Sequence, residues 1–299
     1  MLHNSQKDFI RRHIGPSEKD QEKMLKDLNF KSLDEFINST IPEKIQFKGE
    51  LNIGEPNSEY EALRKLKAIS KKNQIYSNFI GMGYYGTYTP YVILRNILEN
   101  PGWYTSYTPY QPEVAQGRLE MLLNFQQMIV DFTGMDIANA SLLDEGTAAA
   151  EAMGLSHRLN KSDSNLVFVS ENCHPQTIDV IQTRAEPMGL KVLVGNEDKV
   201  LEQLKEDIVC GVLQYPGTLG DIKDPSEAIS KIHKKNGKAI LVCDLLALSM
   251  LKTPRELGAD IAVGSSQRFG IPMGYGGPHA AFFATKDEYK RSMPGRIVG

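Results

Sequence analysis

Six short apolar runs in the second half of the chain constrain its fold more than any other feature. They read LVFV (166–169), LKVLV (190–194), VCGVLQ (209–214), AILVC (239–243), DIAVG (260–264) and HAAFFA (279–284). Runs that are apolar throughout, and not alternating, are typical of strands buried on both faces of a sheet. Helical segments separate them, one of which has Asp224 as N-cap, Pro225 at its first position and Gly237 as its stop signal. The sequence therefore predicts an α/β fold with a mostly parallel sheet.

Residues 1–75 differ from this pattern and are rich in Lys and Glu. Helical patterns occupy residues 18–28, 32–37 and 58–69. The last of these opens with a capping box from Ser58 to Glu61, and an apolar face follows it, formed by Leu63, Leu66 and Ile69. We predict a helical arm over 1–75, packed on the main body or on a partner subunit, and a main domain over 76–299.

Charge and cysteine content exclude several classes of protein. The 34 Lys and Arg residues nearly balance 37 Asp and Glu, so neither a nucleic-acid nor a membrane partner is expected. The chain has no apolar run of the ~18 residues that a membrane span needs, and its first residues lack the apolar core of a secretory signal. Three separated cysteines without a CxxC motif favour reduced thiols in a cytoplasmic protein. Cys173 beside His174 is a minor alternative, a nucleophile pair.

Two segments lie where an α/β sheet collects its ligands, at strand carboxyl ends and helix amino ends. In SLLDEGTAAAEAMG (141–154), Gly146 and Thr147 precede an alanine-rich helix and offer donors for a phosphate. A plain N-cap is the alternative. In SENCHPQT (170–177), His174 follows a strand and could stack on a flat cofactor ring, although a loop histidine more often makes an ordinary hydrogen bond.

Two further segments complete the series. Asp244 ends a buried strand, where a carboxylate needs a cation such as a protonated pyridine nitrogen, unless it only caps the next turn. The last segment, residues 260–284, is a strand that ends in small polar residues and continues into a glycine-rich stretch. Each signal is weak by itself, and the order of the four is more informative.

This order is similar to that of the large domain of pyridoxal-phosphate enzymes of the aspartate-aminotransferase type. In that pattern the turn after the strand that corresponds to DIAVG (260–264) reads S-x-H-K, and its lysine binds the cofactor covalently. Here the turn reads Ser265-Ser266-Gln267-Arg268. Glutamine forms no imine, and the guanidinium of Arg268 stays protonated. The resemblance therefore implies a cofactor-site layout without its catalytic lysine.

Longer motifs resemble the amino-terminal half of the glycine dehydrogenase (decarboxylating) family, the P-proteins of the glycine cleavage system. They are FIRRHIGPS (9–17), GMGYYGTYTPYVILRNILENPGWYTSYTPYQPEVAQGRLE (81–120), LLDEGTAAAEAM (142–153) and GSSQRFGIPMGYGGPHAAFFA (264–284). The resemblance implies that this half is a degenerate copy of the fold. It also implies that pyridoxal phosphate is bound by the carboxy-terminal half.

The family reaction is decarboxylation of glycine, with transfer of the aminomethyl group to the lipoyl arm of H-protein. The resemblance thus implies three partners (the carboxy-terminal half, lipoylated H-protein and glycine) and a dimer or heterotetramer. The aromatic segment is the candidate wall of the substrate pocket or interface, with Tyr84, Tyr85, Tyr107, Tyr110, Gln111 and Glu113. Packing of these tyrosines in the domain's own core is the alternative.

The family pattern continues beyond Gly299 through a small domain, which is expected to be missing here, so a fragment or a split subunit is expected. A self-sufficient pyridoxal-phosphate aminotransferase or decarboxylase that uses another lysine, and a non-catalytic partner subunit, stay open as alternatives. No metal site is expected.

Overall fold

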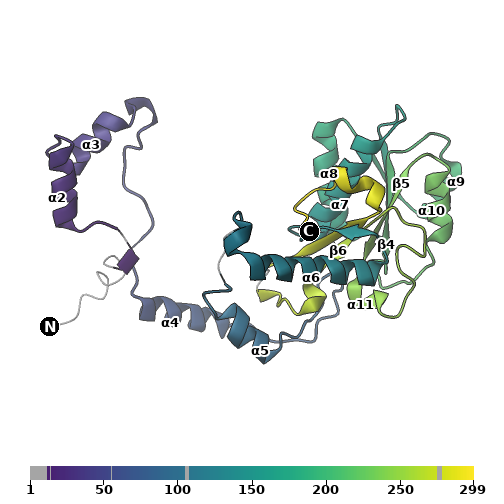
Figure 1. Ribbon diagram of the computed structural model, residues 1–299, viewed down its shortest axis with the longest axis horizontal. Helices are drawn as coiled ribbons and strands as arrows, with labels where there is room; N and C mark the ends of the chain where they lie inside the picture. The colour runs from purple at the N-terminus through teal and green to yellow at the C-terminus, as the bar shows by residue number, and fades with distance from the viewer. Residues whose placement is uncertain (1–11, 14, 55, 105–107, 275–277) are drawn as a thin grey trace. The chain divides into compact units, whose positions relative to one another are not determined.

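The computed structural model describes residues 12–13, 15–54, 56–104, 108–274 and 278–299. The chain separates into two compact units, one of residues up to Ser77 and one of residues from Asn78 to Gly299 (Figure 1). Each unit is described by itself.

The first unit is helical. Its helices are α2 (Glu18–Asp27), α3 (Leu33–Thr40) and α4 (Glu59–Ser70), with a 3-10 turn at Glu43–Ile45. The capping box expected before α4 is present: the amide of Glu61 donates to Ser58 Oγ at 3.3 Å, and the amide of Ser58 donates to the Glu61 carboxylate at 2.9 Å. Leu63, Leu66 and Ile69 on α4 are 58–68% exposed. Packing of this face on another body or subunit stays a prediction.

The second unit contains a seven-stranded sheet in the order β1-β7-β6-β5-β4-β2-β3. Its strands are β1 (Ile137–Ala138), β2 (Leu166–Ser170), β3 (Lys191–Gly195), β4 (Cys210–Tyr215), β5 (Lys238–Cys243), β6 (Ile261–Ser265) and β7 (Ala281–Thr285). The neighbours from β6 to β3 pair in parallel, whereas β7 runs antiparallel to both β6 and β1. The sheet is therefore mostly parallel, as the apolar runs predicted.

Both faces of the sheet are buried because successive residues of each strand enter different cores. On β5, Ile240 and Val242 join one apolar cluster, while Leu241 and Cys243 join the other, and all four are fully buried. This arrangement explains why the strands read as continuous apolar runs. All three cysteines are free and buried. Burial raises the pKa of the Cys173 thiol, which argues against a nucleophilic role.

Helices cover the two faces (Figure 1). Helices α7 (Glu145–Leu159) and α8 (Pro175–Ala185) pack on one face. The other face carries α6 (Gln116–Thr133), α9 (Glu197–Gln203), α10 (Ser226–His233) and α11 (Leu245–Leu248). Shorter turns are α5 (Tyr91–Ile93), a π-helical turn (Leu94–Leu98), and 3-10 turns at Pro112–Val114, Glu186–Met188, Gln267–Phe269 and Asp287–Ser292.

Three details differ from the sequence pattern. Strand β1 is only two residues long, too short for any periodicity to reveal. Helix α10 starts at Ser226, one residue later than expected, and Asp224 instead accepts the amide of Ser226 at 2.9 Å. The same helix ends at His233. The residue with left-handed backbone after it is Asn236, with a φ of 58°, and not Gly237, which was the expected stop signal.

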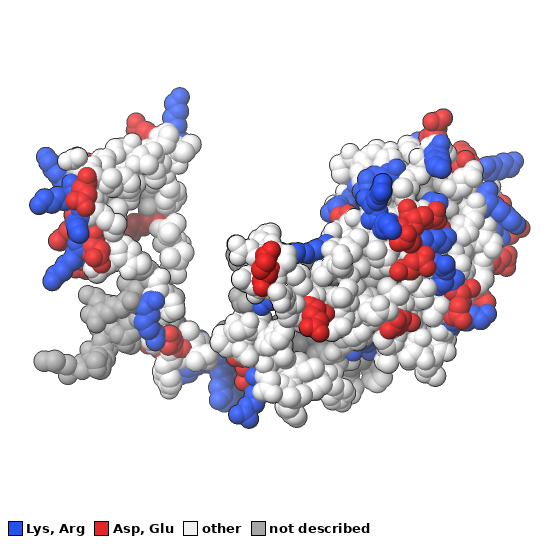
Figure 2. All heavy atoms as spheres, in the orientation of Figure 1, with Lys and Arg blue, Asp and Glu red and all other residues white. Residues whose placement is uncertain are grey.

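The strand order also fixes where a site can form. From β2 the chain crosses to β3 on one side, and the next strand, β4, pairs with β2 on the other side. Ligands of open α/β sheets bind at the carboxyl ends of the strands beside such a reversal. The face drawn in Figure 2 shows Lys and Arg mixed with Asp and Glu over the α/β unit. No helix in the described part of the chain is long and apolar enough to cross a bilayer.

Candidate functional site

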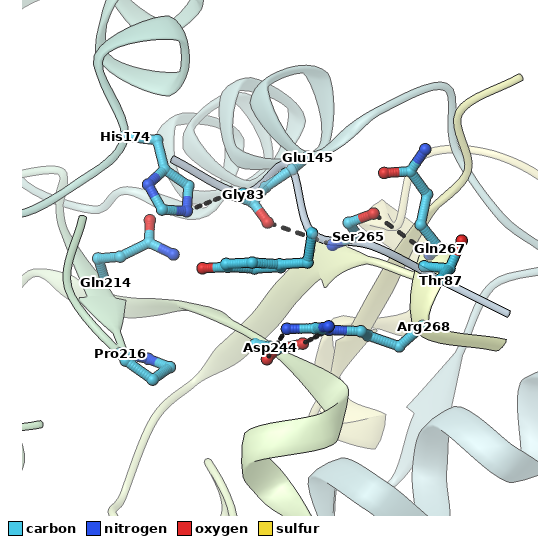
Figure 3. Close-up of a pocket in the computed structure, with 11 residues that line it drawn as sticks. Gly83, Thr87, Glu145, His174, Gln214, Pro216, Asp244, Ser265, Gln267 and Arg268 are labelled. Carbon is cyan, nitrogen blue, oxygen red and sulfur yellow. Dashed lines mark hydrogen bonds and ion pairs between the residues drawn. The ribbon is translucent and has the colours of Figure 1, made fainter. Parts of the chain in front are cut away.

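A small cavity lies at the carboxyl ends of the parallel strands (Figure 3). Its volume is about 20 Å³, which is room for roughly one water molecule. It is lined by Gly83, Tyr85, Thr87, Glu145, His174, Gln214, Pro216, Asp244, Ser265, Gln267 and Arg268. The sheet therefore brings together side chains that are more than 180 residues apart in the sequence.

Asp244 follows β5 and already has a cationic partner. The guanidinium of Arg268 donates to it twice, from Nε to Oδ1 at 2.9 Å and from Nη2 to Oδ2 at 3.0 Å (Figure 3). Asp244 also caps α11, since its Oδ1 accepts the amide of Leu246 at 3.3 Å. The cation that the sequence required for this carboxylate therefore comes from the chain itself, in the planar two-bond geometry that arginine favours.

Tyr85 lies against this ion pair. The guanidinium carbon of Arg268 is 4.0 Å from the centroid of the Tyr85 ring, which is a cation–π contact. Burial of the phenol, with the Asp244 and Glu145 carboxyls nearby, raises the pKa of Tyr85. Tyr85 is therefore neutral and fixed inside the cavity.

Glu145 is the first residue of α7 and points into the same cavity (Figure 3). Its Oε2 accepts the amide of Ser265 at 3.2 Å, and Gln214 donates a second hydrogen bond to it. Burial, to which the Asp244 charge adds, raises the pKa of Glu145 to about 7. This carboxyl group therefore changes its charge near neutral pH.

His174 is buried beside Glu145. Its Nδ1 lies 3.0 Å from Thr218 Oγ1, and its Nε2 lies 3.6 Å from Glu145 Oε1. Burial lowers the pKa of His174 to about 4, so the imidazole is neutral at physiological pH. The contact with Glu145 is therefore not an ion pair under those conditions.

Residues 82–87, which we call the closing segment, run across the cavity. The amide of the Gln176 side chain donates to Met82 O at 2.6 Å, and Thr87 Oγ1 donates to Ile271 O at 2.8 Å. Gly83 has a φ of +82°, and a Cβ there would lie 3.1 Å from the His174 ring. Only glycine passes so close to the imidazole in this left-handed conformation.

The start of α7 is capped from within. Asp144 accepts the amide of Thr147 at 2.6 Å, so this donor is already used. Gly146 lines a second cavity of about 130 Å³, together with Tyr84, Asp144 and Gln267. Thr147 is not among the residues that line either cavity. This geometry matches the plain N-cap interpretation of the two residues.

The aromatic segment does not form one cluster in the described residues. Tyr84 stacks edge-to-face on His279 at 6.1 Å, beside the second cavity. Tyr110 and Gln111 line a separate open groove with Trp103. Glu113 is exposed in the 3-10 turn Pro112–Val114, and Tyr107 lies outside the described residues. Among the candidates that the structure describes, only Tyr85 lines the cavity of His174, Asp244 and Gln267.

Sequence reasoning missed Glu145 and the role of Arg268. One signal was available for the arginine, because a buried strand-end carboxylate requires a cation, and Arg268 stands in the very turn that the pattern placed next to Asp244. Glu145 had no such signal, since an acidic residue in the first turn of a helix is ordinary.

A planar phosphorylated cofactor does not fit the described cavity. The free volume is far too small, and Arg268 already pairs with Asp244. No lysine is among the described residues that line this cavity or the second one. The turn after β6 places Gln267, which is 5% exposed, at the position of the expected lysine.

The raised pKa of Glu145 predicts a pH-dependent stability. The folded chain holds the Glu145 proton more tightly than the unfolded chain, so wild-type stability falls as pH rises from the unfolded value near 4.5 to and beyond 7. Glu145→Gln removes this loss. The free energy of unfolding is measured with urea for the variant and for the wild type. We expect the value for the variant minus the value for the wild type to be about 2 kcal/mol larger at about pH 8 than at about pH 5. Exposed Glu186 is the control, and an equal pH dependence for Glu186→Gln would contradict the assignment.

Comparisons with known proteins show which family the chain is similar to. The family model described as glycine cleavage system P-protein matches residues 11–299. A glycine dehydrogenase (decarboxylating) of Pelagibacter ubique is 81% identical over the whole chain, which covers 31% of that relative. A relative of the same name from Stutzerimonas stutzeri is 56% identical over 97% of the chain and is covered over 30% of its length. The chain thus spans about a third of the relatives that it matches.

Solved structures show the same relationship. A crystal structure of glycine decarboxylase (P-protein) of the glycine cleavage system, in inhibitor-bound form, matches 95% of the chain with a TM-score of 0.85 and 33% identity, over 64% of its own chain. A sphingosine-1-phosphate lyase of Burkholderia pseudomallei shares the fold alone, with a TM-score of 0.60 and 12% identity. The α/β fold of the aspartate-aminotransferase-like type, expected from the sequence, is confirmed. The chain belongs to the glycine cleavage system P-protein family.

Proposed function

We propose that this chain is the amino-terminal, non-catalytic portion of a glycine decarboxylase. The complete protein would decarboxylate glycine with pyridoxal phosphate and pass the aminomethyl group to the lipoyl arm of H-protein. One observation carries the proposal: a chain 81% identical to about a third of a glycine dehydrogenase (decarboxylating) has glutamine where the turn after β6 would place the cofactor lysine. The chemistry is therefore assigned to the portion outside this chain.

Pyridoxal phosphate would be held by the carboxy-terminal half, where it stabilises the negative charge left when CO2 departs. The role of this chain is to cover that site and exclude water from it. The exposed aromatic residues Tyr84 and Tyr110, with Gln111 and Glu113, are the candidate wall, and Tyr107 belongs to the same proposal. Tyrosine suits such a position because it combines a large apolar ring with a polar hydroxyl.

The partners that follow are the carboxy-terminal half, lipoylated H-protein and glycine, in a dimer or heterotetramer. Exposed apolar side chains near the start of the second unit support a covered surface: Phe79 is 93% exposed, Tyr88 96% and Tyr91 87%. Three large, highly exposed apolar side chains within thirteen residues of sequence are candidates for such an interface.

The test measures exchange of bicarbonate with the glycine carboxyl group. We expect none from the 299-residue chain, and activity when the remaining portion of a relative, expressed as a separate chain, is added with H-protein. Borohydride reduction with pyridoxal phosphate, followed by peptide mapping, should place the adduct on the added portion. A stoichiometric adduct on one lysine of this chain would instead favour a self-sufficient enzyme. If the added portion gave the same exchange rate with and without this chain, the chain would be a partner subunit without a catalytic contribution.

A further inference from the structure

An aromatic ring of the chain lies in the cavity where a flat cofactor ring would be expected. The Tyr85 ring stacks on the Arg268 guanidinium, and that guanidinium pairs with Asp244. A six-membered ring and a planar cation beside a carboxylate together match the shape and charge of a protonated pyridine ring. The side chains that a cofactor ring would need are therefore already engaged.

The closing segment occupies the side of the cavity where a cofactor ring would stack on His174. Gly83 lies against the imidazole of His174, the side chain that the sequence assigned to ring stacking. The segment is held at both ends, by Gln176 at Met82 and by Ile271 at Thr87. A ring stacked on His174 would therefore have to displace backbone that is anchored on both sides of the cavity.

The anion position is also occupied. Glu145 places its carboxyl group at the amino end of α7, on the amide of Ser265. Asp144 stands next to it as the N-cap. No Lys or Arg is among the described residues that line the second cavity at this helix start. A phosphate would thus meet carboxyl groups and no compensating cation.

We propose that Tyr85, Arg268 and the closing segment form a resident plug that excludes a pyridoxal ring from this cavity independently of the missing lysine. The inference rests on the proposed function, because it explains how the non-catalytic portion stays free of cofactor. It predicts that Gln267→Lys alone does not restore a cofactor site.

The first experiment compares two aldehydes on the purified Gln267→Lys chain. Borohydride reduction is run with formaldehyde, which is small, and with pyridoxal, and peptide mapping reads position 267. Pyridoxal is used without its phosphate because Glu145 would repel a phosphate separately. We expect methylation at position 267 and only a trace of pyridoxyl adduct there, far below one adduct per chain. A stoichiometric pyridoxyl adduct would overturn the proposal. Failure of both aldehydes would place the block at position 267 itself and would overturn it as well.

The second experiment opens the plug while keeping the Asp244–Arg268 pair. Tyr85→Ala/Gln267→Lys should give about tenfold more pyridoxyl adduct at position 267 than Gln267→Lys. The matched control is Tyr88→Ala/Gln267→Lys, because Tyr88 is a nearby tyrosine that is 96% exposed and lines neither of the two cavities that contain Gln267. Equal yields from the two double variants would overturn the role of Tyr85. These yields are measured on the chain alone, so failure of the exchange assay would leave them unchanged and would count only against the proposed function.

Discussion

Replacing Arg268 with alanine is expected to lower the free energy of unfolding by about 3 kcal/mol. The substitution leaves the Asp244 carboxylate without its cation, although that side chain is only 18% exposed. It also removes the surface on which Tyr85 stacks. Urea denaturation of the purified variant measures the loss.

The control for this prediction is a second Arg–Asp ion pair on the same unit, in which one guanidinium nitrogen, Nη1 of Arg255, makes both hydrogen bonds. Arg255 donates to both oxygens of Asp136 at 3.0 and 2.9 Å, but the two side chains are 46% and 37% exposed. Arg255→Ala should therefore cost less than about 1 kcal/mol. Asp244→Asn/Arg268→Ala should recover part of the loss, since no charge is then left unpaired. Similar losses for Arg268→Ala and Arg255→Ala would show that the Asp244–Arg268 pair is an ordinary surface contact.

Gly264→Ala is expected to destabilise the domain by about 4 kcal/mol or more. A Cβ at Gly264 in β6 would lie 2.1 Å from the carbonyl oxygen of Cys243 and 2.8 Å from the Phe282 ring. The oxygen belongs to the backbone of the neighbouring strand β5, so relief requires the strands to separate. Thermal melting and far-ultraviolet circular dichroism test this, and an unchanged melting temperature would contradict the packing of β5 against β6.

Gly117→Ala is the matched control for Gly264→Ala. Gly117 lies in the first turn of α6, and a Cβ there would meet no heavy atom within 4 Å. Alanine lowers the conformational entropy of the unfolded chain at such a position, so a gain of about 0.5 kcal/mol is expected. The same chemical change should therefore have opposite signs at the two sites.

The sequence predicted the sheet well because strands that are buried on both faces are apolar throughout, and such runs are visible in the sequence. Every strand from β2 to β7 falls within about two residues of an apolar run, and the parallel strands end at one edge. That shared edge explains why His174, Asp244 and Gln267 could be assigned to one site from the sequence alone. Strand β1 was not predicted, because it has only two residues and forms through pairing with β7, which is distant in the sequence.

The interior of the site was much less predictable. Tyr84 and Tyr85 are adjacent and identical in chemistry, yet only Tyr85 lies in the cavity of Asp244. The choice depends on the path of the closing segment, which is fixed by hydrogen bonds to residues about 90 and 180 positions away. Glu145 likewise meets Ser265 across 120 positions. Contacts of this range follow from packing, and local sequence does not encode them.

The way in which Tyr85, Glu145 and Arg268 fill the cavity also bears on how reversible this site is in evolution. Losing a catalytic lysine takes one substitution, and restoring it takes one more. Under the plug proposal, side chains from separate segments occupy the space that a cofactor ring would need. A lysine introduced at position 267 then brings no benefit until the others also change, and changing Arg268 first exposes Asp244 to the loss predicted above. Each intermediate step then lowers stability without a gain in activity, so the domain would keep the non-catalytic role proposed for it.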